Sequence, residues 1–84
     1  MEHLRRGRAA LERGDAALAV RELEATVELR PTMPAPWKEL GRAQLALGHE
    51  REAIQAFRHY LVVAPQAGDA PAVRSRLLQL GVRE

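Results

Sequence analysis

Residues 7–14, GRAALERG, recur at residues 41–48 as GRAQLALG. The offset that places Gly7 on Gly41 also pairs Pro31 with Pro65. It pairs apolar residues along the second half of each copy as well, for example Leu23 with Phe57. A fixed period of this length is typical of repeat architectures, in which each copy is one supersecondary unit. The chain of 84 residues therefore contains one duplicated unit.

Each unit is predicted to form two helices joined by a tight turn. Gly14 suits the position just after a helix, where a positive φ is needed, and Asp15 can cap the helix that follows. Pro31 ends that second helix, because proline cannot continue one. We therefore expect helices over residues 2–13 and 15–29, and the same division in the second unit.

Apolar residues lie at helical spacing on one face of the second helix of each unit. The two matching stripes are Ala19, Val20, Leu23 and Val27, and Ala53, Ile54, Phe57 and Leu61. The first helix of the second unit presents a facing stripe of Trp37, Leu40, Gln44 and Leu47. Helices joined by so short a turn lie antiparallel, and small residues at Gly41 and Ala43 let their backbones approach closely. Each unit is thus predicted to be a helical hairpin.

A fifth helix is expected after Pro65, capped by Asp69 and ending near Gly81. Its apolar stripe is Ala70, Val73, Leu77 and Leu80. Aligning this helix so that Gly81 matches Gly48 needs an offset one position shorter than that of the duplicated unit. With this shorter offset, Ser75 and not Arg76 takes the position that corresponds to Arg42. The fold class is therefore all-α, a single domain of five helices over 1–84. Its parts are a first repeat over 1–33, a second over 34–67 and a closing helix over 68–84.

Composition excludes several classes of protein. Aromatic residues make up only 4% of the chain and β-branched residues are sparse, which argues against an all-β fold. The absence of cysteine excludes disulfides and thiolate chemistry, and the net charge is only +2. Charged residues occur throughout residues 1–30, and no apolar run is long enough to span a membrane. We expect a cytoplasmic protein without a membrane partner, and the preference for arginine over lysine indicates a bacterial, GC-rich coding sequence.

Catalytic and metal-binding motifs are missing. His49 and Glu50 begin like a zinc-protease helix, but Ala53 stands where that motif needs its second histidine. Ser75 is not set between the glycines of a nucleophile elbow, and no glycine-rich phosphate loop precedes a lysine. We predict no enzymatic activity, no metal and no cofactor. Acidic residues accompany most of the arginines that a nucleic-acid site would need, so no nucleic-acid partner is predicted either; those arginines are Arg5, Arg6, Arg8, Arg74, Arg76 and Arg83.

Three motifs in the second unit resemble a known family. Trp37-x2-Leu40-Gly41, Ala53-x3-Phe57 and Pro65, together with the period of the duplication, are similar to the tetratricopeptide repeat. The first unit departs from this pattern, since His3 and Arg6 stand at the places of the tryptophan and the leucine. The second unit departs only at Gln44, where the family usually has tyrosine. The resemblance implies hairpins stacked as a short right-handed superhelix. It also implies a concave face, lined by the first helices, that binds extended or helical segments of partner proteins.

A candidate binding groove follows from the spacing of residues beside the packing stripe. Lys38, Arg42 and Leu45 form one row, and the preceding unit presents Leu4, Arg8 and Leu11 at matching places. Arg8 and Arg42 are expected to be neighbours. Guanidinium groups bind carboxylates and apolar patches bury side chains, so the row favours an acidic or C-terminal peptide with hydrophobic anchors. The alternative is that both arginines are solvated positions repeated by duplication.

Some family members hold a terminal carboxylate with lysine, asparagine and arginine, but this chain contains no asparagine. The main hypothesis is a non-catalytic adaptor that binds a partner peptide or helix along Leu4, Arg8, Leu11, Lys38, Arg42 and Leu45. A second hypothesis is a homo-oligomerisation module, because two repeats and one helix fall below the usual three repeats of a stable stack. A third is the docking part of a larger signalling or secretion protein.

Overall fold

The computed structural model describes residues 2–82 and contains, within them, five helices and no strand. The helices are α1 (Glu2–Glu12), α2 (Ala16–Leu29), α3 (Pro34–Ala46), α4 (Glu50–Val63) and α5 (Ala70–Gln79). The predicted all-α class and the number of helices are confirmed. Met1, Arg83 and Glu84, which the predicted domain and the set of arginines include, lie outside the described residues. No described helix is sufficiently long and apolar to cross a membrane.

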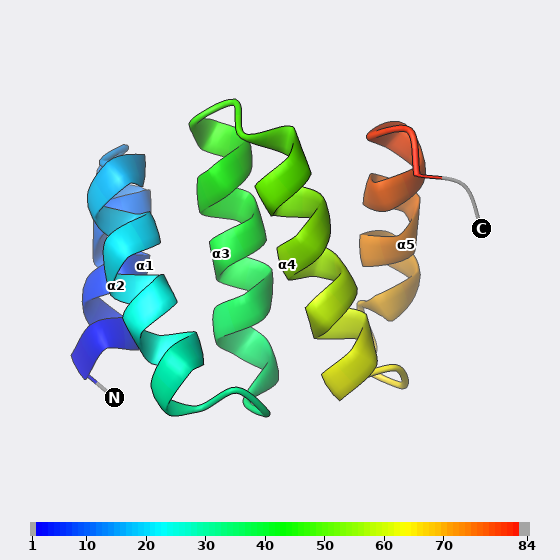
Figure 1. Cartoon of the computed structure of the whole chain (residues 1–84), viewed down its shortest axis with the longest axis horizontal. Helices are drawn as coiled ribbons and strands as arrows, with labels where there is room; N and C mark the ends of the chain where they lie inside the picture. The colour runs from blue at the N-terminus through cyan, green and yellow to red at the C-terminus, as the bar shows by residue number, and fades with distance from the viewer. Residues whose placement is uncertain (1, 83–84) are drawn as a thin grey trace.

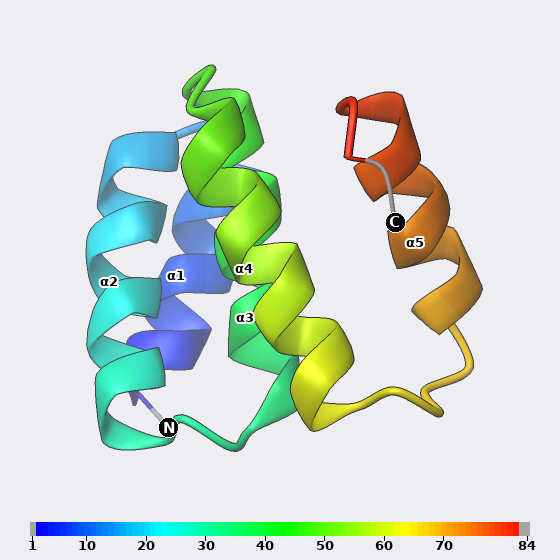
Figure 2. The same cartoon turned by 45° about the vertical axis from the view of Figure 1, so that its right-hand side comes forward.

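The helices form a row of antiparallel pairs. α1 packs against α2, α3 packs against α4, and α3 also packs on α2, so the two hairpins form one array. Figure 1 shows α5 at the far edge of this array, and Figure 2 shows the same helix beside α4. Among the helices, α5 makes its backbone approach to α4 alone. The last helix is therefore attached along one side only.

The turns between helices follow the predicted glycine and aspartate rules. Gly14, Gly48 and Gly81 have φ values of 83°, 78° and 92°, a region that glycine enters without steric cost. The backbone N–H of Leu18 donates to Oδ1 of Asp15 at 3.2 Å, so the predicted cap of α2 is present. The local signals in the sequence therefore place both hairpin turns correctly.

The core consists of two clusters, one that extends from α1 to α4 and one between α4 and α5. The first contains Leu4, Ala10, Ala19, Leu23, Val27, Leu40, Ala43 and Ala56. The second contains Ala53, Phe57, Tyr60, Val73 and Leu77. Trp37 packs against both clusters, its Nε1 donates to the carbonyl of Pro31 at 2.8 Å, and its ring stacks on His59 with centroids 4.3 Å apart. The predicted helical hairpins are therefore joined at α3.

The predicted cap of α5 is wrong. Asp69 does occupy the position before α5, but its carboxylate makes no hydrogen bond to the backbone of that helix. Its ψ is 7°, against 74° at Asp15, and a capping residue needs a more extended backbone to place its side chain over the first N–H groups. The carboxylate instead accepts hydrogen bonds from Lys38 and Tyr60. This aspartate therefore connects α5 to α3 and α4.

A groove across α1, α3 and α5

Three open hollows follow one another across the first helices of the array. The first is lined by Leu4, Arg5, Arg8, Ala9 and Glu12. The second is lined by Arg8, Leu11, Glu12, Glu39 and Arg42. The third, of about 220 Å³, is lined by Lys38, Arg42, Leu45, Phe57, Asp69, Ala72, Val73 and Arg76. Because Arg8 borders the first two hollows and Arg42 borders the last two, the three adjoin one another in a row, which we call the groove.

The structure brings five of the six predicted groove residues into the second and third hollows. Arg8, Leu11 and Arg42 line the second hollow together, and Lys38 and Leu45 join Arg42 in the third. Leu4 belongs mainly to the core, since only 7% of its surface is exposed, and it reaches the first hollow with one edge. Leu4 therefore contributes more to folding than to the groove surface.

Glu39 lies between the two arginines of the groove. Its Oε2 is 3.4 Å from Nε of Arg8, and its Oε1 is 3.0 Å from Nη1 of Arg42. The glutamate side chain is only 13% exposed, whereas the arginines are 50% and 61% exposed. A partly buried carboxylate thus orients two guanidinium groups whose remaining N–H donors face solvent. Sequence reasoning missed Glu39, although its spacing of three residues from Arg42 is the ordinary signal of an ion pair on a helix.

A second acid, Asp69, forms an ion pair with Lys38 of the groove. Nζ of Lys38 is 2.7 Å from Oδ2 of Asp69, and the hydroxyl of Tyr60 donates to the other carboxylate oxygen. The same ammonium lies 5.7 Å from the centroid of the Tyr60 ring. The hydrogen bond from Lys38, and after it the one from Tyr60, lowers the pKa of the Asp69 carboxyl. The same bond to Asp69, with burial, raises the pKa of Tyr60 to about 12.

Arg76, not Ser75, reaches the groove from α5, so the expected register is corrected. Arg76 lines the third hollow opposite Arg42, and Ser75 does not. The buried stripe of α5 passes through Val73 and Leu77. Ser75 lies two residues from each and so points about 200° away from them round the helix, whereas Arg76 lies within about 100° of both. The shorter offset matches Gly48 with Gly81 but does not match the groove positions.

The chain is similar in sequence to known proteins. The family model described as tetratricopeptide repeat matches residues 10–79. The chain belongs to the tetratricopeptide repeat family. A TPR repeat-containing protein of Pseudomonas aeruginosa is 39% identical over 66 residues, which cover 79% of this chain and 63% of that protein. The chain therefore matches less than two thirds of the relative's length. No solved structure matches it.

Tetratricopeptide repeats generally mediate protein–protein interactions and are generally not catalytic modules. Within residues 2–82, no group of three histidine, cysteine, aspartate or glutamate side chains is arranged to hold a metal ion. The side chains that line this groove offer ion pairing, hydrogen bonding and apolar burial.

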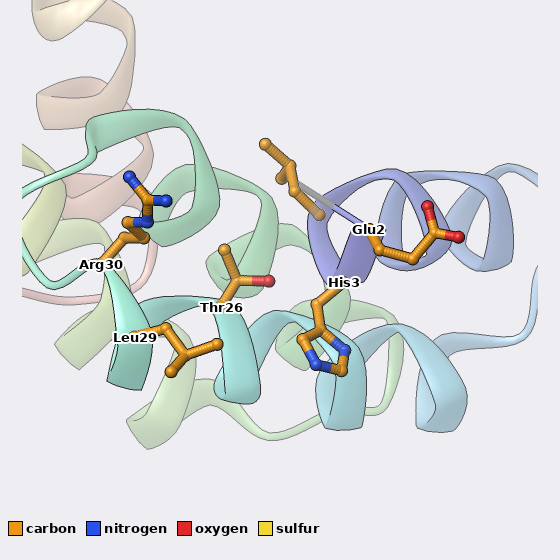
Figure 3. A pocket seen from close by; sticks show the side chains of 6 residues that line it. Glu2, His3, Thr26, Leu29 and Arg30 are labelled. Carbon is orange, nitrogen blue, oxygen red and sulfur yellow. The ribbon is translucent and has the colours of Figure 1, made fainter.

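A further hollow of about 150 Å³ lies where α1 begins and α2 ends. Figure 3 shows Glu2, His3, Thr26, Leu29 and Arg30 around it, with the His3 ring beside α2. Nδ1 of His3 is 2.6 Å from Oε1 of Glu22, and the hydrogen bond lowers the pKa of that carboxyl. The pair of His3 and Glu22 therefore links α1 to α2 on this side of the first tetratricopeptide repeat.

Proposed function

We propose that the chain is a non-catalytic adaptor that binds an acidic segment of a partner protein along the groove. The observation that carries this proposal is the row of adjoining hollows, in which Arg8 and Arg42 are shared walls between neighbours. A cationic group thus recurs at each boundary between hollows. In this proposal α5 is the closing helix of the second hairpin and supplies a further arginine, Arg76.

Charge and apolar surface alternate along the groove. Arg42 and Arg76 border the third hollow, and the side chains of Leu45, Phe57 and Val73 also line it. Guanidinium groups bind carboxylates through paired N–H donors, and the apolar lining offers burial to a hydrophobic side chain between them. The arrangement favours a peptide in which acidic residues flank a leucine-like anchor, with either a side-chain or a terminal carboxylate.

The test is fluorescence anisotropy with a library of short labelled peptides that combine aspartate, glutamate and leucine in varied order. Matched peptides carry asparagine and glutamine in place of the acids. We expect acidic peptides to bind and the Arg8→Gln, Arg42→Gln double variant to lose at least about tenfold in affinity, because a hydrogen bond to a charged group is worth about 1.5–3 kcal/mol.

The control for this double variant is Arg21→Gln with Arg58→Gln. Both arginines are exposed on second helices, away from the groove, so this double substitution removes the same net charge without changing the groove. Equal losses in the two double variants would mean that attraction to the whole protein, and not the groove, holds the peptide. The absence of binding by every peptide of the library, both to the folded protein and to its Asp69→Asn variant, would exclude the proposed function.

Self-association is a second candidate, supported by the outer side of α5. Leu78 is 62% exposed. Together with Arg74, Leu77 and Val82 it lines a hollow of about 140 Å³. An apolar residue exposed next to a hollow suits a contact between copies. The mass measured by light scattering over a range of concentrations tests this candidate. Leu78→Ser should abolish any dimer, and a constant monomer mass excludes the candidate.

The proposed setting is a bacterial cytoplasm, in line with the composition and with the relative from Pseudomonas aeruginosa. Because the chain matches 63% of that relative, the groove can also serve as the docking part of a longer protein. The peptide-binding assay applies unchanged to either arrangement.

A further inference from the structure

The lysine of the groove is already paired with a carboxylate of the chain itself. Lys38 and Tyr60 each donate one hydrogen bond to a different oxygen of Asp69, so the two donors hold the carboxylate as they would hold that of a ligand. Asp69 lines the same hollow as Arg42 and Arg76. The acid is therefore inside the proposed binding site and not merely near it.

A partner's carboxylate cannot share this ammonium without cost. Two carboxylates bound to one ammonium lie within about 4–6 Å of each other, where like charges disfavour both. Lys38 and Asp69 are 34% and 38% exposed, so water screens this repulsion only in part. Binding at Lys38 therefore weakens the hold on Asp69, and the hold on Asp69 weakens binding at Lys38.

The helix that carries Asp69 is attached in a way that permits this exchange. α5 packs against α4 through a short stripe of Ala70, Val73 and Leu77. The ion pair of Asp69 adds a polar link from the N-terminal end of α5 to α3. Residues attached by few buried contacts open locally at low free-energy cost. Release of Asp69 would move the first turn of α5, which forms one wall of the third hollow.

We propose that Asp69 is an internal competitor for Lys38, so that binding of an acidic partner and attachment of the N-terminal end of α5 oppose each other. This inference rests on the proposed function, because it concerns the same groove. It adds that the unliganded groove is partly masked by the chain's own carboxylate. A partner with a carboxylate at this position replaces Asp69 and keeps the contacts of Arg42 and Arg76.

The direct test is Asp69→Asn, which removes the charge but leaves an oxygen that accepts the Tyr60 hydrogen bond. The probe is the acidic leucine-containing peptide that binds most tightly to the unmodified protein or, if none binds, the whole acidic library. We expect Asp69→Asn to bind about two- to fivefold more tightly at low ionic strength, the size expected for one partly exposed ion pair. In a Lys38→Gln background the same substitution should give no gain.

Asp15→Asn is the matched control. Asp15 also precedes a helix, its removal changes the net charge equally, and asparagine caps a helix as well as aspartate does. Asp15 lies at the start of α2, and its carboxylate does not line the groove. An equal gain in affinity for Asp15→Asn and Asp69→Asn would assign the effect to overall charge and overturn the inference.

A second measurement follows α5 itself. The N–H groups of Ala70 and Val73 donate to the carbonyl oxygens of Ala67 and Asp69. Hydrogen exchange at these two amides should become faster when the peptide binds to the unmodified protein, whereas simple docking would leave it unchanged or slow it. Peptide binding with unchanged affinity in Asp69→Asn, or with unchanged or slowed exchange at these amides, overturns the competitor and leaves the proposed function standing. Absence of binding to both the unmodified protein and Asp69→Asn overturns the proposed function together with this inference.

Discussion

Gly41 and Phe57 are in direct contact across the second hairpin. A Cβ atom on Gly41 would lie 2.6 Å from Cε1 of Phe57 and 2.8 Å from two further ring carbons. The first hairpin repeats the relationship between Gly7 and Leu23, where a Cβ would lie 2.7 Å from Cγ. The duplicated glycine therefore gives the large side chain of the facing helix the space that it fills. This contact sets how closely the two helices of each hairpin approach.

Gly41→Ala should destabilise the protein although alanine is the better helix former. The helix propensity gains about 1 kcal/mol, but a separation under 3.0 Å forces the Phe57 ring out of a packed core, which costs about 1–3 kcal/mol. We expect a net loss of about 1 kcal/mol in the free energy of unfolding. Urea unfolding followed by circular dichroism measures it.

Gly68→Ala serves as the control, because a Cβ there meets nothing within 4 Å. Its unfolding midpoint should stay near that of the unmodified protein. If Gly41→Ala were as stable as this control, the close approach would not determine the hairpin spacing.

Asp15 should contribute to stability as a helix cap. Its carboxylate accepts the N–H of Leu18, and loss of such a cap costs about 1 kcal/mol. Asp15→Ala should therefore lower the free energy of unfolding by about this amount, while Asp15→Asn should retain nearly all of it. Thermal unfolding of the three proteins compares them, and equal losses for alanine and asparagine would show that the cap hydrogen bond contributes little.

Sequence rules predicted those features that depend on neighbours along the chain. The helix ends at Gly14 and Gly48 and the cap at Asp15 need only local backbone geometry, and all three are present. Asp69 resembles Asp15 in residue type and in its place before a helix, yet its ψ differs and its partners are elsewhere. Lys38 lies 31 residues from Asp69, so no local rule could pair them.

The proximity of Arg8 and Arg42 could be predicted for a related reason. Repeat symmetry places Arg8 and Arg42 in equivalent positions, and the structure gives them a common hollow. Symmetry ends at α5, whose backbone approaches that of α4 alone among the described helices and which is not the first half of a third hairpin within the described residues. The rotation of that helix, and with it the position of Arg76, depends on tertiary packing and could not be obtained from an offset.

Tyr60 should titrate at unusually high pH. It is the sole tyrosine of the chain, so absorbance of the phenolate reports on this group directly. The hydrogen bond to Asp69 and burial raise its pKa from 10.0 to about 12. Because the folded value is the higher one, the stabilisation is fully present below pH 10 and is lost as the pH rises towards 12.

The comparison for this titration is Asp69→Asn, with circular dichroism recorded in parallel to detect unfolding. Removal of the carboxylate charge should move the midpoint of the Tyr60 titration back towards 10.0, the ordinary value. A midpoint near 10.0 in the unmodified folded protein would mean that the hydroxyl does not donate to Asp69 in solution.

Acid should weaken the first hairpin through Glu22. The hydrogen bond with His3 lowers the pKa of this carboxyl from its ordinary value of 4.5, so the folded form holds its proton less tightly than the unfolded form. A depressed value means that the stabilisation is present above pH 4.5 and is lost as the pH falls through the folded pKa.

Glu22→Gln should therefore lower the melting temperature at pH 6 but bring it closer to that of the unmodified protein as the solution is acidified. Glu24→Gln, on an exposed position of the same helix, is the control and should leave the melting temperature unchanged at pH 6. Parallel acid profiles for the unmodified protein and Glu22→Gln would contradict a native pair between Glu22 and His3.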